Sequence, residues 1–124
     1  MDYFTTILSL AGIQHEKNDG ENLVPALTKN TNLERDELFW HYPHYHGSAW
    51  KPGSALRKGD WKLAIHYEDM QTKLFNLTND PGETTNIANQ NLEKVAELKA
   101  ILNTKLADSN AKFPEVDADY DPED

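Results

Sequence analysis

Residues 53–67 read Gly-Ser-Ala-Leu-Arg-Lys-Gly-Asp-Trp-Lys-Leu-Ala-Ile-His-Tyr, and this stretch decides the fold. Gly59-Asp60 is a dipeptide typical of a two-residue hairpin loop, so two strands are predicted on either side of it, at about 54–58 and 61–67. Side chains alternate between the two faces of a strand. The faces expected for the second strand are Trp61, Leu63, Ile65 and Tyr67 toward the core, and Lys62, Ala64 and His66 toward a wetter surface.

Further strands are predicted on both sides of this hairpin. Residues 37–42, Glu-Leu-Phe-Trp-His-Tyr, have the composition of a strand that Pro43 ends, and residues 72–77 form a fourth strand. A helix is predicted at 91–107 because its apolar residues recur at helical spacing, with Lys99 inside the apolar stripe. The stripe consists of Leu92, Val95, Leu98, Leu102 and Leu106.

A short helix is predicted at the start of the chain. Asp2 is a suitable N-cap and Gly12 a suitable stop, and such a short helix needs a surface to pack on. Its apolar residues are Phe4, Ile7, Leu8, Leu10 and Ala11. The fold class is therefore α+β: a small antiparallel sheet of about four strands packed against a long C-terminal helix.

Composition excludes several classes of function. The net charge is −9, and six of the 21 acidic residues lie in 115–124. A net acidic chain without a basic stripe is a poor candidate for binding nucleic acid or anionic membranes. No apolar run approaches the roughly 20 residues of a membrane span. The absence of cysteine excludes disulfides, thiolate zinc sites and a cysteine nucleophile, but it leaves the compartment open.

Two motifs carry a family resemblance. Arg-x-Gly-Asp-Trp-Lys-Leu at 57–63 and Leu-Phe-Asn-Leu-x-x-Asp-Pro-x-Glu-x-x-Asn at 74–86 resemble the C-terminal region of the type I sulfatases, enzymes that hydrolyse sulfate esters. The frame Asp2, Thr6 and Gly12 and the aromatic run 39–42 extend the resemblance over roughly residues 2–107. The chain departs from the family pattern at Thr5, where proline is usual, and at Asn22, where serine is usual.

The resemblance implies a parent enzyme with a large α/β domain of the alkaline-phosphatase type, which holds calcium and a catalytic formylglycine. Formylglycine is made from Cys or Ser in a Cys/Ser-x-Pro/Ala-x-Arg motif, and this chain has no such motif. No catalytic residue, metal ligand or cofactor site is therefore assigned here. The implied partners are the catalytic large domain and a sulfated carbohydrate, and the implied location of the parent is periplasmic or secreted. The isolated chain is expected to self-associate or to have a loosely held N-terminal helix.

The domain organisation expected from this resemblance has three parts. Residues 1–36 would form the N-terminal helix and loops at the end of the missing large domain, 37–112 the C-terminal subdomain, and 113–124 an acidic tail. Without the large domain, Phe4, Ile7 and Leu8 would be exposed.

The loop after Pro43 is the candidate substrate site. In a sulfatase it would lead toward the mouth of the active site, where His44, His46, Trp50 and Lys51 would contact a sugar and its sulfate. Aromatic faces, imidazoles and an ammonium group suit a sulfated carbohydrate. Ordinary loop packing is the alternative interpretation.

Other polar clusters have a functional and a structural interpretation. The histidines of 41–46 suit zinc or copper, although no acid or cysteine completes a ligand shell. Arg57 and Lys62 would bind sulfate or pair with local acids. Three polar residues of 80–86 would bind calcium or order their own turn; they are Asp80, Glu83 and Asn86.

The leading hypothesis is the C-terminal portion of a sulfatase, which completes the substrate pocket and does no catalysis alone. The alternatives are a stand-alone module that binds a glycan or a protein through the Tyr/His/Trp loop, and a metal-binding protein built on the histidines.

Overall fold

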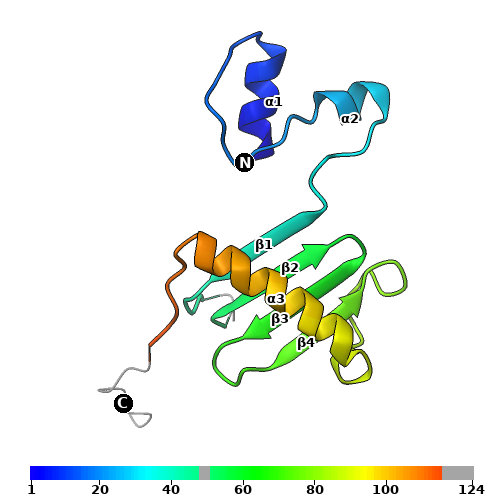
Figure 1. Cartoon of the computed structure of the whole chain (residues 1–124), viewed down its shortest axis with the longest axis vertical. Helices are drawn as coiled ribbons and strands as arrows, with labels where there is room; N and C mark the ends of the chain where they lie inside the picture. The colour runs from blue at the N-terminus through cyan, green and yellow to red at the C-terminus, as the bar shows by residue number, and fades with distance from the viewer. Residues whose placement is uncertain (48–50, 116–124) are drawn as a thin grey trace. The chain divides into compact units, whose positions relative to one another are not determined.

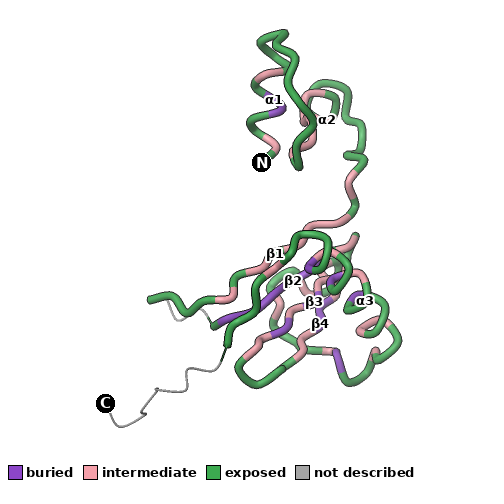
Figure 2. Tube along the Cα trace, turned by 60° about the vertical axis from the view of Figure 1, so that its left-hand side comes forward, coloured by how far each residue is buried: buried purple, intermediate pink, exposed green. Residues whose placement is uncertain are grey.

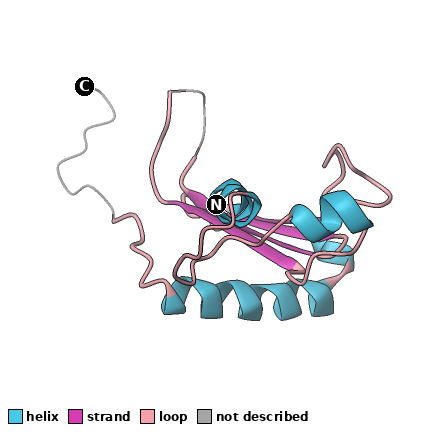
Figure 3. Cartoon of the chain, turned by 90° about the horizontal axis from the view of Figure 1, so that it is seen from above, coloured by secondary structure: helices cyan, strands magenta, loops and turns pink. Residues whose placement is uncertain are grey.

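The structure, a computed structural model, describes residues 1–47 and 51–115. The chain divides into two compact units, Met1–Asp36 and Glu37–Asp124. The larger unit contains an antiparallel sheet in the order β1-β2-β3-β4 and a long helix that lies along one face of it (Figures 1 and 3). Its elements are β1 (Glu37–Tyr42), β2 (Gly53–Lys58), β3 (Trp61–His66), β4 (Thr72–Asn76), η1 (Ala88–Gln90) and α3 (Leu92–Asp108). The predicted α+β architecture is confirmed.

The sheet register follows from the predicted hairpin. Lys58 pairs with Trp61, which leaves Gly59 and Asp60 as a two-residue loop, and Gly59 adopts a φ of 54°. A residue that carries a Cβ atom is strained at this positive φ, whereas glycine is not. The turn therefore places Leu56 directly opposite Leu63.

The core consists of one row of side chains across the sheet and the helix that covers it. Leu56, Leu63 and Leu74 occupy paired positions on three neighbouring strands, and all three are fully buried. They meet three buried leucines of α3: Leu98, Leu102 and Leu106. Within this unit, most of the buried positions fall in the strands and on α3 (Figure 2). Each fully buried leucine contributes about 1.5–3 kcal/mol, so this contact dominates the stability of the unit.

The predicted helical stripe is right for its centre and wrong at its start. Leu92 is 69% exposed and lies outside the core. Leu92 is the first residue of the helix, so its side chain lies beyond the part of α3 that packs on the leucine row. Ile101 packs against the core as well.

The motif at 74–86 orders its own backbone. Both oxygens of Asp80 accept hydrogen bonds from the backbone of Thr84 and Thr85, which lowers the pKa of that carboxyl. The side-chain oxygen of Asn86 accepts hydrogen bonds from the amides of Leu74 and Ala88. The motif thus fixes the connection between β4 and η1, in agreement with the structural interpretation of these residues.

The smaller unit contains α1 (Asp2–Leu10) and α2 (Val24–Lys29). Gly12 ends the first helix with a φ of 69°, as predicted. The prediction that Asp2 caps α1 is wrong, because Asp2 already lies in the helix and Met1 is the capping residue. The carboxylate of Asp2 instead accepts two hydrogen bonds from the guanidinium of Arg35, at 3.0 and 2.6 Å, and one from the amide of Glu21.

Thr5 and Thr6 are the buried residues of α1, whereas its large apolar side chains face outward. Thr6 accepts a hydrogen bond from the amide of Leu23, and Thr5 donates one to Asn18. Four apolar residues of the helix are at least 58% exposed: Tyr3, Phe4, Ile7 and Leu10. The buried residues of this unit are therefore polar, and most of the large apolar side chains of α1 are exposed.

Replacing a leucine of the central contact tests the core. Leu102→Ala should lower the free energy of unfolding by about 2–5 kcal/mol, because it leaves a cavity against the leucine row. Leu92→Ala is the matched control on the same helix and should cost less than about 0.5 kcal/mol. Urea denaturation of the two variants measures both values, and equal losses would contradict the assigned core.

The pairing of Asp2 with Arg35 should be visible in a pH titration. The Arg35 guanidinium, and after it the Glu21 amide, lowers the pKa of Asp2 from 3.8 to about 2. Because the folded pKa is depressed, this stabilisation is present above about pH 4 and is lost as the pH falls through about 2. The Glu21 amide resonance should report a midpoint near pH 2, and Arg35→Met should raise it toward 3.8. The same midpoint in both proteins would show that the pair does not form.

Candidate functional site

The loop predicted to bind substrate connects β1 to β2 at one end of the sheet. The structure describes His44, His46 and Lys51 in this loop, whereas Trp50 lies outside the described residues. The three described residues do not converge on one point. They belong to three different local environments.

His44 lies in an open cavity of about 830 Å³, named here the His44 pocket. The cavity is lined by Pro43, His44, Tyr45 and Pro52 of the loop and by residues 112–115, which follow α3. The ring of His44 packs edge-on against Tyr42, with 5.6 Å between the ring centres. Tyr45 is 66% exposed, so the pocket offers aromatic, imidazole and proline surfaces to solvent.

Lys51 forms an ion pair with Glu68, which lies in the connection between β3 and β4. The carboxylate raises the pKa of the Lys51 ammonium, which therefore stays protonated at neutral pH. Both side chains are largely exposed, so the pair is weak and a competing anion can exchange with Glu68.

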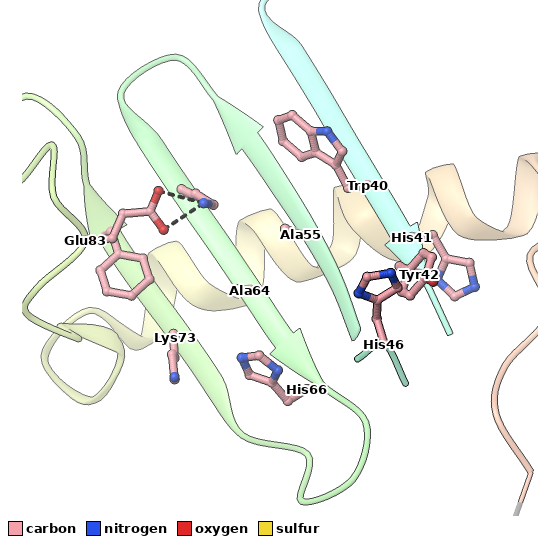
Figure 4. A pocket seen from close by; sticks show the side chains of 11 residues that line it. Trp40, His41, Tyr42, His46, Ala55, Ala64, His66, Lys73 and Glu83 are labelled. Carbon is pink, nitrogen blue, oxygen red and sulfur yellow. Dashed lines mark hydrogen bonds and ion pairs between the residues drawn. The ribbon is translucent and has the colours of Figure 1, made fainter. Parts of the chain in front are cut away.

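His46 lines a second cavity, named the sheet pocket, on the face of the sheet away from α3 (Figure 4). This open cavity of about 780 Å³ has a floor of small residues, Ala55 and Ala64, and Trp40 borders it with half of its surface exposed. The predicted wetter face is thus confirmed, since Ala64 and His66 of β3 point into the pocket (Figure 4).

The Nδ1 atom of His66 is buried in this face and has no hydrogen-bond partner within residues 1–47 and 51–115. Buried polar atoms are usually paired, because an unpaired one has lost its water without a replacement. On the same face, Lys62 forms an ion pair with Glu83 at 2.6 Å (Figure 4). Arg57 donates to the carbonyl of Gly59 instead. The local-pairing interpretation therefore describes Lys62, whose partner Glu83 is 21 residues away in the sequence.

A hydrogen-bonded group that sequence reasoning did not assign lies on the opposite, helix-covered side. His41 Nε2 lies 2.7 Å from the carbonyl oxygen of Lys112, and its Nδ1 lies 2.7 Å from Ser54 Oγ. Ser54 Oγ lies 2.5 Å from the hydroxyl of Tyr67. The sequence did contain one signal. His41 lies two residues after Phe39 on β1 and therefore shares its core-facing side, where an imidazole needs hydrogen-bond partners.

The histidines of 41–46 do not form a metal centre. His41 points to the helix side, His46 lines the sheet pocket and His44 lines the His44 pocket. Within the described part of the chain, no group of three or more His, Asp or Glu residues is placed to hold a metal ion. The residues do not fit the calcium site that the sulfatase resemblance implies for a parent enzyme.

Comparison with known proteins identifies the family. The family model described as N-sulphoglucosamine sulphohydrolase, C-terminal, matches residues 1–112. The chain belongs to this family of C-terminal sulfatase regions.

A sulfatase from Formosa agariphila is 32% identical over 119 residues, which cover 86% of this chain and 22% of that protein. A putative sulfatase structure from Bacteroides thetaiotaomicron shares the fold with a TM-score of 0.79 at 24% identity, over 98% of this chain and 27% of its own. A third protein, solved in complex with its substrate D-glucosamine-2-N,6-O-disulfate, is 26% identical with a TM-score of 0.71, over 86% of this chain and 23% of its own.

The chain therefore spans about a quarter or less of the length of these relatives. These matches favour the sulfatase hypothesis over a stand-alone binding module. No described helix is both long and apolar enough to cross a membrane.

Proposed function

We propose that this chain is the C-terminal portion of a formylglycine-dependent sulfatase that acts on a sulfated carbohydrate, and that it binds the substrate while the rest of the enzyme does the chemistry. The family match over residues 1–112 is the observation that carries the proposal. The chain has no cysteine and no serine in the formylglycine motif, and its described residues offer no calcium cage. Formylglycine and calcium would belong to the catalytic domain.

The substrate class is taken from the relatives. The family description names N-sulphoglucosamine, and one relative was solved with a glucosamine disulfate as its substrate. A sulfated glucosamine presents sugar hydroxyls, apolar ring faces and sulfate charges. Imidazoles, aromatic rings and an ammonium group suit these features.

The loop between β1 and β2 supplies those groups. We assign substrate contacts to His44, His46 and Lys51, and to Trp50, which the structure does not describe. Lys51 is held in place by Glu68 in the unbound protein and exchanges this carboxylate for a sulfate of the substrate. The exchange replaces one ion pair by another, so it costs little.

The catalytic domain is the proposed partner of the exposed apolar side chains. Phe4 and Ile7 of α1 are 58% and 61% exposed, and exposed apolar side chains that lie together mark interaction surfaces. Trp40, which is half exposed, gives the sheet pocket an apolar border as well. Without the catalytic domain, these surfaces would drive self-association of the chain.

We extend the proposal to a periplasmic or secreted parent enzyme, which the family resemblance implies.

A titration of this chain with a heparin-derived tetrasaccharide, followed by amide resonances, tests the proposed binding. Shifts should concentrate in residues 43–47 and at Lys51 and Glu68, with a Kd of about 1 mM for the isolated portion. Lys51→Met should raise the Kd by roughly tenfold or more, because it removes a charged hydrogen bond. Glu68→Gln should lower it by roughly two- to fivefold, because it removes the competing carboxylate.

Lys94→Met is the matched control for this titration. Lys94 also forms a surface ion pair, with Glu97, but both residues lie on α3 and away from the loop. This variant should leave the Kd unchanged. Equal weakening by Lys51→Met and Lys94→Met would indicate attraction by net charge alone and would contradict a site at the loop.

A further inference from the structure

The hydrogen bond between His41 and Lys112 has a defined direction. The carbonyl of Lys112 only accepts, so Nε2 of His41 carries the hydrogen and donates it. In a neutral imidazole Nδ1 is then an acceptor, and two hydroxyls lie within reach of it, Ser54 Oγ at 2.7 Å and Tyr67 OH at 3.2 Å. The two hydroxyls also lie 2.5 Å from each other, and either of them can donate in that pair. Ser54 and Tyr67 together therefore hold the His41 ring in the orientation that directs Nε2 to Lys112.

Ser54 and Tyr67 are sheltered from solvent and do not form a nucleophilic site. Ser54 is 4% exposed, and burial raises the pKa of Tyr67, which keeps its hydroxyl protonated. Phe113 packs edge-on against both rings, with centres 5.5 Å from His41 and 5.3 Å from Tyr67. A substrate carbonyl has no access to Ser54. The role of the group is structural or positional.

The end of α3 directs the chain into this group. Asn110 takes a left-handed φ of 51°, and the amide of Ala111 bonds back to the carbonyl of Leu106. This is the helix-ending arrangement that reverses the chain direction. The next residue, Lys112, then receives the hydrogen bond from His41. The segment after α3 is therefore fixed at both of its first two residues.

The segment held in this way lines the His44 pocket. Residues 112–115 border that cavity together with Pro43, His44 and Tyr45 of the loop. Phe113 is 55% exposed even though its ring packs on His41 and Tyr67, so part of it remains available to a ligand. The hydrogen bond from His41 to Lys112 thus holds a segment that lines the same cavity as His44, a residue of the proposed substrate loop.

We propose that the segment 112–115 is the second wall of the substrate site, that Phe113 and Pro114 pack against a pyranose ring of the sulfated saccharide, and that His41, Ser54 and Tyr67 are positioning residues for this wall. The inference rests on the proposed function for the identity of the ligand. Aromatic and proline faces suit the C–H faces of a sugar ring, and His44 supplies a hydrogen-bonding group from the opposite wall.

Trypsin cleavage between Lys112 and Phe113 tests the positioning role without any ligand. His41→Leu removes the donor to Lys112 and should raise the cleavage rate by about tenfold, because the segment opens more often. His41→Gln keeps an N–H donor near the position of Nε2 and should restore slow cleavage. Cleavage after Lys105, inside α3, reports global unfolding and should stay unchanged in both variants. Equal cleavage at Lys112 in His41→Leu and wild type would overturn the positioning role of His41.

Titration with the heparin-derived tetrasaccharide tests the wall. Phe113→Ala and His41→Leu should each raise the Kd by about fivefold, and His41→Gln should restore it. Wild-type binding with an unchanged Kd in Phe113→Ala would overturn the wall and leave the proposed function standing. Absence of wild-type binding would overturn the proposed function and the wall with it, while the trypsin experiment would still report on the positioning role of His41.

Discussion

The contact between the leucine row of the sheet and α3 is the interaction on which the rest of the structure depends. Leu56, Leu63 and Leu74 are aligned by the strand pairing, and they leave one continuous apolar ridge for Leu102 and its neighbours on the helix. A register shift of one residue would turn this ridge to the other face and expose it. The hairpin at Gly59 and the buried ridge therefore enforce the same register.

This contact places the loop between β1 and β2 and the segment after α3 at the same end of the sheet. β1 ends at Tyr42 and β2 begins at Gly53, so the loop leaves and re-enters the sheet at that end. α3 runs along the core face of the sheet and ends at Asp108, and the chain then returns to His41 on β1. Two segments far apart in sequence thus border the His44 pocket. The rigid sheet and helix support a site that is built from loops.

The sequence was sufficient to predict the elements that depend on local pattern. The strand at Glu37–Tyr42, the loop at Gly59 and the leucine face of α3 follow from turn chemistry and periodicity. The loop sequence, by contrast, named His44, His46 and Lys51 as candidates but could not indicate that they occupy separate environments. Their positions depend on partners that are remote in sequence, such as Glu68 for Lys51.

Two other features show the same limit. Asp2 has the sequence context of a helix cap, but Arg35, 33 residues away, offers its carboxylate a stronger pair of hydrogen bonds. His41 belonged to an unusual aromatic cluster, but its role depends on Lys112, 71 residues away. Local pattern does not encode these partners. They are defined only when the strands and α3 have been assembled.

In the proposed enzyme, this chain would supply the binding portion and the catalytic domain the chemical portion. Steady-state kinetics of the full-length sulfatase with His44→Ala or His46→Ala test this division most directly, with its natural sulfated sugar and a small aryl sulfate as substrates. We expect a higher KM and a roughly ten- to hundredfold lower kcat/KM on the sugar, an unchanged kcat, and no effect on the aryl sulfate. A loss of kcat on both substrates, or no change on either, would contradict it.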